Sequence, residues 1–198
     1  MSENFDLKEI ILIGGGGHCK SVIDVIEQQG IYKIAGIIDK PSRVDSDVLG
    51  YKVIGCDSDL EVMAKKYNYA IVTVGQTRSS TLRRDLFDLL TRIGFLLPSI
   101  IAPDAYVSKH SNIGKGVVIL HGAVINANAS IGDNCIINSK ALIEHDCQVN
   151  NHCHISTSAV LNGGVIIEEE SFIGSGAIIK ESTRVIKSSF VKAGSLVV

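Results

Sequence analysis

The second half of the sequence repeats with a period of six residues, and this repeat limits the possible folds more than any other feature. From residue 101 to residue 197, every sixth residue is Ile, Val or Leu, without a single insertion. The residue four places after each is usually small, as at Ala123, Cys135 and Ser171. The aliphatic positions are Ile101, Val107, Ile113, Ile119, Ile125, Ile131, Ile137, Ile143, Val149, Ile155, Leu161, Ile167, Ile173, Ile179, Val185, Val191 and Val197.

This period excludes the common alternatives to a solenoid. A coiled coil needs a repeat of about 3.5 residues, and an ordinary sheet alternates every two residues. Six residues suit one short strand and one corner, with the aliphatic residue inside and the small residue where the chain bends. Such repeats bury their apolar faces by stacking on one another. The pattern resembles the hexapeptide-repeat family, whose left-handed parallel β-helix has three such units in each coil.

The first half follows a different pattern, in which strands and helices alternate. Apolar strands are expected at residues 8–13, 33–38 and 69–74, and helices at residues 18–29, 60–66 and 81–93. Alternation of this kind indicates a small parallel, Rossmann-like sheet covered by helices. We therefore expect an α/β domain over residues 1–98 and a left-handed β-helix domain over residues 99–198.

The composition argues against several classes of protein. The net charge is −2 without a run of like charges, which disfavours a dedicated nucleic-acid or membrane-surface protein. The apolar run at residues 10–13 is too short for a signal peptide or a membrane span. We expect a soluble cytoplasmic protein with reduced thiols. Cys135, Cys147 and Cys153 occupy the small-residue position of the repeat, so we interpret them as packing residues and not as metal ligands.

A glycine loop follows the first predicted strand and precedes the first helix. Gly14 to Gly17 allow close approach of a ligand, and the amides at a helix start can bind an anion. Asp39 ends the next strand, where a carboxylate could accept from a hydroxyl or an imide. A dinucleotide site needs a third glycine where Cys19 stands, which disfavours an NAD-dependent oxidoreductase. The loop predicts a nucleotide site of another kind, and a purely structural turn is the alternative.

His145 is the histidine best placed for catalysis. It follows the interior residue Ile143 by two places, so its side chain should point outward. Glu144 and Asp146 flank it, and either could orient an imidazole for general-base catalysis. His121 occupies the same position of its repeat but has no flanking acid. From spacing alone, His145 could also be an ordinary surface residue.

A longer motif narrows the family. Residues 138–147 (NSKALIEHDC), 154–156 (HIS) and 161–164 (LNGG) resemble the sialic acid O-acetyltransferase group of hexapeptide acyltransferases. This group includes the N-acetyltransferases of bacterial UDP-4-amino-sugar pathways, such as bacillosamine biosynthesis. The resemblance implies acetyl-CoA as co-substrate, a homotrimer with acetyl-CoA between adjacent β-helices, and no metal.

The resemblance also assigns roles to residues. It implies that His145 is the general base and that Asp146 polarises it. The remaining assignments are His154 and Gly163 for acetyl-CoA, Asn138 for the sugar, and Gly16, Gly17, His18, Asp39 and Gly75 for the nucleotide-sugar. The family often has two consecutive acids where this chain has Asp39 and Lys40, which leaves the choice of nucleotide open.

These observations predict an N-acetyltransferase that acts on a 4-amino-4,6-dideoxy sugar linked to a nucleotide, and UDP is the favoured nucleotide. An O-acetyltransferase of sialic acid or a related nonulosonic acid is the first alternative, and it differs because a free sialic acid carries no nucleotide for Asp39 to hold. A non-enzymatic nucleotide-binding scaffold is the second alternative, and it would not bind acetyl-CoA.

Overall fold

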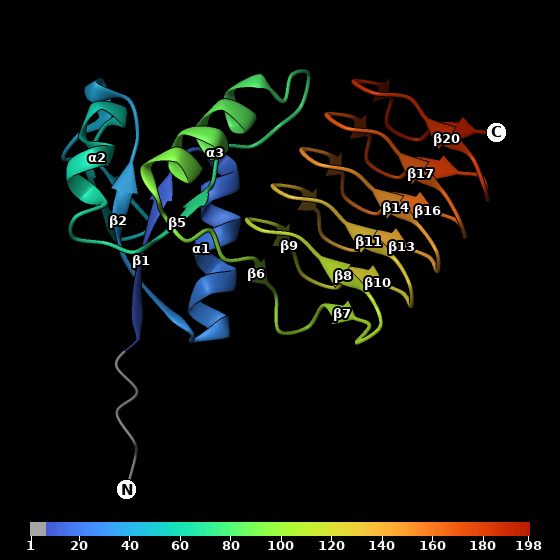
Figure 1. Cartoon of the computed structure of the whole chain (residues 1–198), viewed down its shortest axis with the longest axis horizontal. Coiled ribbons are helices and arrows are strands. Elements are labelled where there is room, and N and C mark those ends of the chain that lie inside the picture. Colours follow the sequence, from blue (N-terminus) through green and yellow to red (C-terminus); the bar gives the residue numbers. More distant parts are fainter. Residues whose placement is uncertain (1–6) are drawn as a thin grey trace, which may run out of the picture.

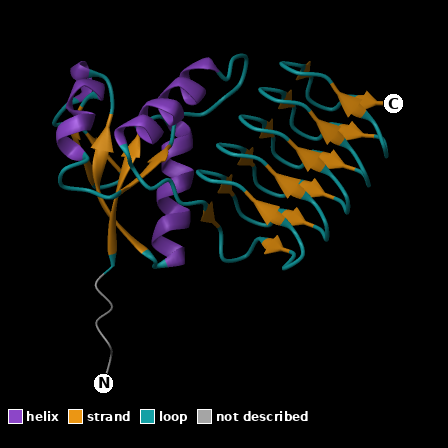
Figure 2. Cartoon of the chain, viewed as in Figure 1, coloured by secondary structure: helices purple, strands orange, loops and turns teal. Residues whose placement is uncertain are grey.

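The computed structural model describes residues 7–198 as an α/β domain joined to a left-handed parallel β-helix (Figures 1 and 2). The sequence predicted both parts of this fold, and both are confirmed. The predicted boundary at residues 98 and 99 lies between the last helix of the first part and the first strand of the second. No helix in the described range has both the length and the hydrophobicity to span a bilayer.

The α/β part contains one five-stranded sheet in the order β3-β4-β2-β1-β5. Its elements are β1 (Lys8–Ile13), α1 (Gly17–Gln29), β2 (Tyr32–Ile38), a 3-10 turn (Pro41–Arg43), β3 (Asp47–Val48), β4 (Tyr51–Gly55), a 3-10 turn (Asp57–Asp59), α2 (Leu60–Met63), β5 (Tyr69–Val72) and α3 (Thr81–Ile93).

All strand pairs of this sheet are parallel except that of β3 with β4. The sequence did not predict this hairpin, so the sheet is mixed where a parallel sheet was expected. The predicted helix at 60–66 is also shorter, because α2 ends at Met63.

The β-helix consists of two-residue strands, and each of the predicted aliphatic positions is the second residue of one of them. The strands are β6 (Ile100–Ile101), β7 (Tyr106–Val107), β8 (Asn112–Ile113), β9 (Val118–Ile119), β10 (Val124–Ile125), β11 (Ser130–Ile131), β12 (Ile136–Ile137), β13 (Leu142–Ile143), β14 (Gln148–Val149), β15 (His154–Ile155), β16 (Val160–Leu161), β17 (Ile166–Ile167), β18 (Phe172–Ile173), β19 (Ile178–Ile179), β20 (Arg184–Val185), β21 (Phe190–Val191) and β22 (Leu196–Val197).

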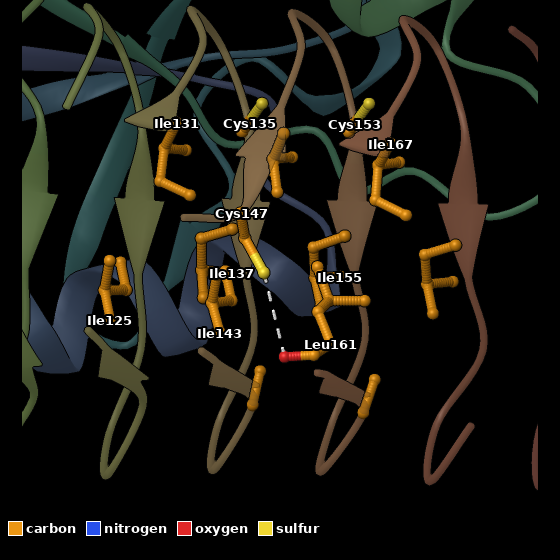
Figure 3. Packing of buried hydrophobic residues seen from close by; sticks show 14 of the residues in the cluster. Ile125, Ile131, Cys135, Ile137, Ile143, Cys147, Cys153, Ile155, Leu161 and Ile167 are labelled. Atoms are coloured by element: carbon orange, nitrogen blue, oxygen red, sulfur yellow. Dashed lines mark hydrogen bonds between the residues drawn. The ribbon is translucent and has the colours of Figure 1, made fainter. Parts of the chain in front are cut away.

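These strands form three parallel sheets, one on each side of a triangular prism. We call them the first sheet (β21-β18-β15-β12-β9-β6), the second sheet (β22-β19-β16-β13-β10-β7) and the third sheet (β20-β17-β14-β11-β8). Neighbouring strands pair in register, as Ile125 does with Ile143, so each coil takes three repeats. The aliphatic residues therefore stack along the prism interior, as Figure 3 shows for Ile125, Ile143 and Leu161.

The small residues of the repeat are not where the chain bends, which corrects the expectation from the sequence. Ala123, Cys135 and Ala141 are fully buried in the prism core. The bend lies one residue earlier, where residues such as Asn134 and Asp146 adopt a left-handed backbone conformation with positive φ. The residue after each bend is small because its side chain points into a narrow corner of the prism that stacked aliphatic residues already fill.

The cysteines of the repeat serve as packing residues. All five cysteines are free, and the three in the repeat are buried (Figure 3). Their thiols donate to backbone carbonyls, as Cys147 Sγ does to the Asn162 oxygen at 3.1 Å. Among the described residues, no group of three or more His, Cys, Asp or Glu side chains could hold a metal ion.

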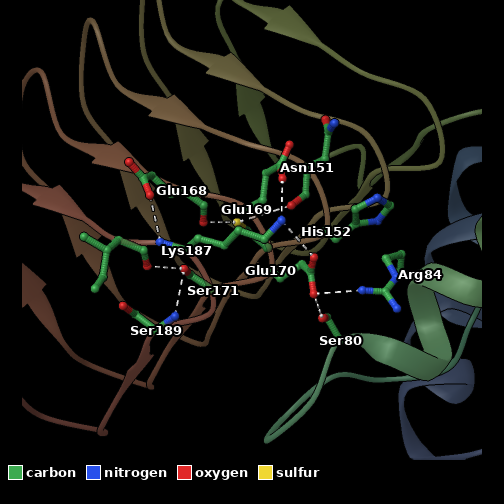
Figure 4. A network of polar contacts seen from close by, with 12 residues as sticks. Ser80, Arg84, Asn151, His152, Glu168, Glu169, Glu170, Ser171, Lys187 and Ser189 are labelled. Carbon is green, nitrogen blue, oxygen red and sulfur yellow. Dashed lines mark hydrogen bonds and ion pairs between the residues drawn. The ribbon is translucent and has the colours of Figure 1, made fainter.

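The α/β part is docked on the first sheet of the prism. Ile100, Val118 and Leu120 share one apolar core with α1 and the central strands. At one edge of this contact, Arg84 of α3 forms an ion pair with Glu170 at 3.0 Å, and Ser80 donates to the same carboxylate (Figure 4). The docking surface therefore combines an apolar centre with polar contacts at its rim.

A buried arginine also crosses this contact. Arg83 is 1% exposed and donates to the backbone oxygens of Val72, Val74 and Asn134. Burial lowers its pKa to about 10, so the guanidinium is still charged at neutral pH. These three carbonyl oxygens stabilise the buried charge, while Arg83 Nη2 is buried without a partner in residues 7–198. Because one of the oxygens belongs to Asn134, Arg83 links the two parts.

Candidate active site

His145 and Asp146 form an exposed imidazole–carboxylate pair at the corner between the second and third sheets. His145 Nδ1 lies 2.7 Å from Asp146 Oδ2. An ionised carboxylate only accepts hydrogen bonds, so Nδ1 carries the proton and donates. The Nε2 lone pair is then free, and the His145 side chain is 66% exposed. This is the arrangement that a general base requires.

The corner conformation decides which acid orients the imidazole. Asp146 has a φ of 62°, which turns its carboxylate toward the neighbouring ring. Glu144 instead accepts from Asn126 at 2.8 Å in the preceding coil. Asn128 donates to the other oxygen of Asp146 at 2.7 Å. Hydrogen bonds from Asn128 and His145 hold the pKa of the Asp146 carboxyl below its ordinary value, so it stays ionised.

Gly163 lies in the next coil directly against this imidazole. A Cβ atom at residue 163 would lie 2.8 Å from His145 Cε1 and 3.0 Å from Nε2. Real Cβ atoms do not approach so closely, so any side chain here would displace the ring. The glycine predicted to serve acetyl-CoA is thus also the residue that leaves space for His145.

His121 occupies the same repeat position but serves a different purpose. Its Nδ1 lies 2.9 Å from Asp104 and its Nε2 lies 3.0 Å from Asp24 of α1. The hydrogen bond to Asp104 is the main cause of a raised His121 pKa. Both ring nitrogens are occupied, so His121 cannot act as a base and instead links α1 to the β-helix. The sequence showed no acid beside it because both partners lie far away along the chain.

The glycine loop lies at the topological switch point of the α/β sheet. Residues 14–17 follow β1 and residues 73–76 follow β5, on either side of the crevice where parallel sheets bind ligands. Gly14 has a φ of 104°, and a Cβ there would lie 2.5 Å from Val74. Gly16 precedes the first residue of α1 with no side-chain cap, and Gly16 and Gly17 are exposed. The unpaired amides at the start of α1 can therefore receive an anion.

Asp39 holds the glycine loop in place. Its Oδ2 accepts from the Gly15 amide at 3.1 Å and from Arg43 Nη1 at 2.9 Å, and its Oδ1 accepts from the Lys40 amide at 2.8 Å. Arg43 also donates to the Gly15 oxygen. The predicted nucleoside contact of Asp39 would add to these bonds, since the carboxylate already supports the loop.

His18 and His154 lie together in the contact between the two parts. His154 Nδ1 donates to the Gln76 oxygen at 2.6 Å, and its Nε2 accepts from Asn138 at 3.1 Å. Both His154 nitrogens are therefore used within the chain, so its contact with acetyl-CoA stays a prediction. His18 Nε2 is buried without a partner among the described residues, and Gly75 packs on its side chain.

Burial keeps both of these imidazoles neutral. It is the main cause that lowers the pKa of His18 to about 3 and that of His154 to about 4. The unfolded chain therefore binds more protons than the folded chain once the pH falls below about 6.5, the ordinary histidine value.

We expect the free energy of unfolding to fall as the pH drops from about 6.5 to 5, where paired carboxylates are still ionised. The slope should be at most about 1.4 kcal/mol per pH unit for each imidazole. Urea unfolding at several pH values measures it. Replacing His154 by Asn should flatten the slope, whereas replacing the exposed His110 by Asn should not, and equal slopes in all three proteins would contradict this account.

A single chain does not bring all predicted site residues together. Gly16, Gly17, Asp39 and Gly75 belong to the part docked on the first sheet. His145 lies at the corner opposite that sheet, where the second and third sheets meet. Within residues 7–198, the hydrogen bonds between the two parts involve only the first sheet and its corners. In one chain, the predicted nucleotide site of the α/β part (called the nucleotide half below) and the His145 imidazole therefore face different directions.

Two family models match the sequence. The PglD N-terminal domain matches residues 9–89, and the bacterial transferase hexapeptide (six repeats) matches residues 110–145. No curated protein sequence gave a match.

Several solved structures are similar over nearly the whole chain. A His-to-Asn mutant of perosamine N-acetyltransferase from Caulobacter crescentus, in complex with CoA and GDP-perosamine, is 33% identical. The alignment covers 96% of this chain and 88% of that chain, with a TM-score of 0.90. The acetyltransferase domain of PglB from Neisseria gonorrhoeae, in complex with acetyl coenzyme A, is 32% identical over 96% of this chain and 93% of that chain, with a TM-score of 0.87. WeeI from Acinetobacter baumannii shares the fold at 20% identity, with coverage of 96% and 95% and a TM-score of 0.53.

Proposed function

Because this chain belongs to the hexapeptide-repeat acetyltransferases of the bacillosamine-pathway type, and is thus an acetyl-CoA-dependent acetyltransferase, we propose that it acetylates the amine of a nucleotide-linked 4-amino-4,6-dideoxy sugar. The relative from Caulobacter binds CoA together with GDP-perosamine, which supports a nucleotide-linked amino sugar as acceptor. The family resemblance of the sequence favours UDP as the nucleotide. The observation that carries the proposal is the exposed His145–Asp146 pair with its free Nε2.

The proposed reaction needs one general base and no covalent enzyme intermediate. The sugar amine attacks the thioester carbonyl carbon while His145 Nε2 takes a proton from the amine. The C–S bond then breaks, and the imidazolium returns the proton to the departing CoA thiolate. The products are an N-acetylated sugar and CoA with a free thiol. Asp146 would stabilise the imidazolium and keep Nδ1 protonated throughout.

A second copy of the chain would complete the site, which supports the homotrimer that the sequence predicted. The outward residues of the second sheet are all apolar, unlike those of the third sheet. They are Tyr106, Val124, Leu142, Val160, Ile178 and Leu196, and three of them are at least 43% exposed. An apolar sheet face of this kind marks an interface. His145 borders this face, so a neighbouring chain covering it can bring its own nucleotide half toward the imidazole.

A shared site predicts complementation between two impaired variants. One variant would carry His145→Ala and the other Gly16→Asp, which weakens nucleotide binding, so turnover is compared at a nucleotide-sugar concentration well below the wild-type KM. Unfolding and refolding them together should restore about one quarter of wild-type turnover, because in a random cyclic trimer about one interface in four has both halves intact. Each variant refolded alone is the control. If mixed trimers recover no turnover, the His145 base and the nucleotide site of each active site come from one chain.

A thiol-release assay tests the reaction itself. Purified protein is incubated with acetyl-CoA and a panel of nucleotide-linked 4-amino sugars, and the released CoA thiol is measured. The proposal expects release that depends on the amino group, with an amide in the product by mass spectrometry. Release with free sialic acid and not with nucleotide-linked amines would favour the O-acetyltransferase. No release and no acetyl-CoA binding by calorimetry would favour a scaffold.

A further inference from the structure

A small cavity opens at the carboxyl edge of the α/β sheet, beside the glycine loop. Its volume is about 90 Å³. Ile13, Ile38 and Val74 form its apolar walls, and Leu82 of α3, which is 57% exposed, lines it as well. Apolar walls next to an anion-binding loop suit the base of a nucleotide whose phosphates lie at the start of α1.

Two charged side chains at this cavity have no partner in the described part of the chain. Lys40 and Asp57 both line it and are both exposed. No side-chain hydrogen bond or ion pair in residues 7–198 uses the Lys40 ammonium or the Asp57 carboxylate, including one between the two. Asp39, by contrast, already accepts three hydrogen bonds. The cavity therefore offers a ligand one free cationic donor and one free anionic acceptor.

The Lys40 ammonium and the Asp57 carboxylate together distinguish between the nucleobases. Guanine presents an acceptor, O6, followed by two adjacent donors, N1–H and the N2 amino group, and a carboxylate can accept from both donors at once. Lysine is a usual partner for O6. Uracil presents a single N–H between two carbonyl oxygens, which a carboxylate repels. Adenine and cytosine each place one amino donor beside a ring nitrogen acceptor, so they match a carboxylate with one bond only.

We propose that Lys40 and Asp57 select a guanine nucleotide, so that the acceptor is a GDP-linked amino sugar. This inference rests on the proposed function and departs from the UDP that the family resemblance favours. Lys40, two residues after β2, supplies from the cavity wall the donor that the O6 atom of guanine requires. Asp57 supplies the acceptor from the neighbouring 3-10 turn.

Calorimetry with GDP and UDP alone tests base selection without catalysis. We expect wild-type protein to bind GDP at least about tenfold more tightly than UDP. Asp57→Asn should weaken GDP binding by about 10–100-fold and leave UDP binding almost unchanged. Asp45→Asn is the matched control, because it makes the same charge change at an exposed residue of the same domain that does not line the cavity. Equal binding of GDP and UDP, tighter binding of UDP, or no binding of either would overturn the inference.

A second readout separates this inference from the proposed function. The thiol-release assay is repeated with the same amino sugar linked to GDP or to UDP. Suppose the protein binds GDP selectively, Asp57→Asn removes this selectivity, and no acetyl group is transferred to any amine. That result would support selection of guanine and overturn the proposed function. Transfer to the UDP-linked sugar that is equal to or faster than transfer to the GDP-linked sugar would retain the proposed function and overturn base selection.

Discussion

Replacing His145 by Ala is expected to lower kcat about 10²–10⁴-fold, the usual cost of losing a general base. The amine would then have to lose its proton to water, which is a weaker and unpositioned base. KM for both substrates should change little, since the imidazole acts in the transition state. The side chain is 66% exposed, so its removal leaves no cavity and the thermal unfolding temperature should stay near that of the wild type. Steady-state thiol release measures kcat.

His121→Ala is the matched control for this variant. Both histidines occupy the same position of the repeat, but His121 is bound on both nitrogens by Asp104 and Asp24. Its loss should lower the unfolding temperature slightly and leave kcat within a small factor of the wild type. A His145→Ala protein with wild-type kcat, or a His121→Ala protein with an equal loss, would contradict the assignment of His145 as the base.

Gly16→Asp is expected to raise KM for the nucleotide-linked sugar about tenfold or more. Gly16 precedes the first turn of α1 in extended backbone (φ −80°, ψ −165°) and has no neighbour within 4 Å of an added Cβ. Aspartate fits this position and can cap the helix. Its charge would, however, lie where the diphosphate should bind, so the two anions would repel each other. KM for acetyl-CoA should not change.

The matched control at this position is Gly16→Asn, which adds a side chain of the same shape without a charge. The two variants should have similar unfolding temperatures, at or above that of the wild type. If Asn raises KM as much as Asp, the effect comes from bulk and not from charge. If neither variant changes KM, the diphosphate does not bind at the start of α1.

The β-helix is the part of the fold that could be predicted best from the sequence. Each interior aliphatic residue from Ile101 to Val197 falls on the strand position that the period predicts. The period says nothing about which residue of a corner takes the left-handed conformation, so the bend was misplaced by one residue. The β3–β4 hairpin was missed because β3 contains only two residues, too few to show alternation.

The candidate site could be predicted only where its residues are neighbours in the sequence or in the repeat. His145 and Asp146 are adjacent, so the sequence itself predicts that they act together. The contacts of His121 with Asp24 and of Arg83 with Asn134 join residues that are 97 and 51 positions apart. No pattern in a single sequence reports such pairs, because they depend on how the α/β part docks on the prism. Asn128, one coil before Asp146, could have been found from the repeat alone.

A crystal structure of the protein with CoA and a nucleotide-linked 4-amino sugar is the most direct test of how acetyl transfer occurs. We expect the sugar amine to lie within about 2.6–3.2 Å of His145 Nε2, with the nucleotide held by the glycine loop of an adjacent chain and the CoA sulfur beside the amine. An amine bound elsewhere, with the His145 ring facing only solvent, would contradict the account.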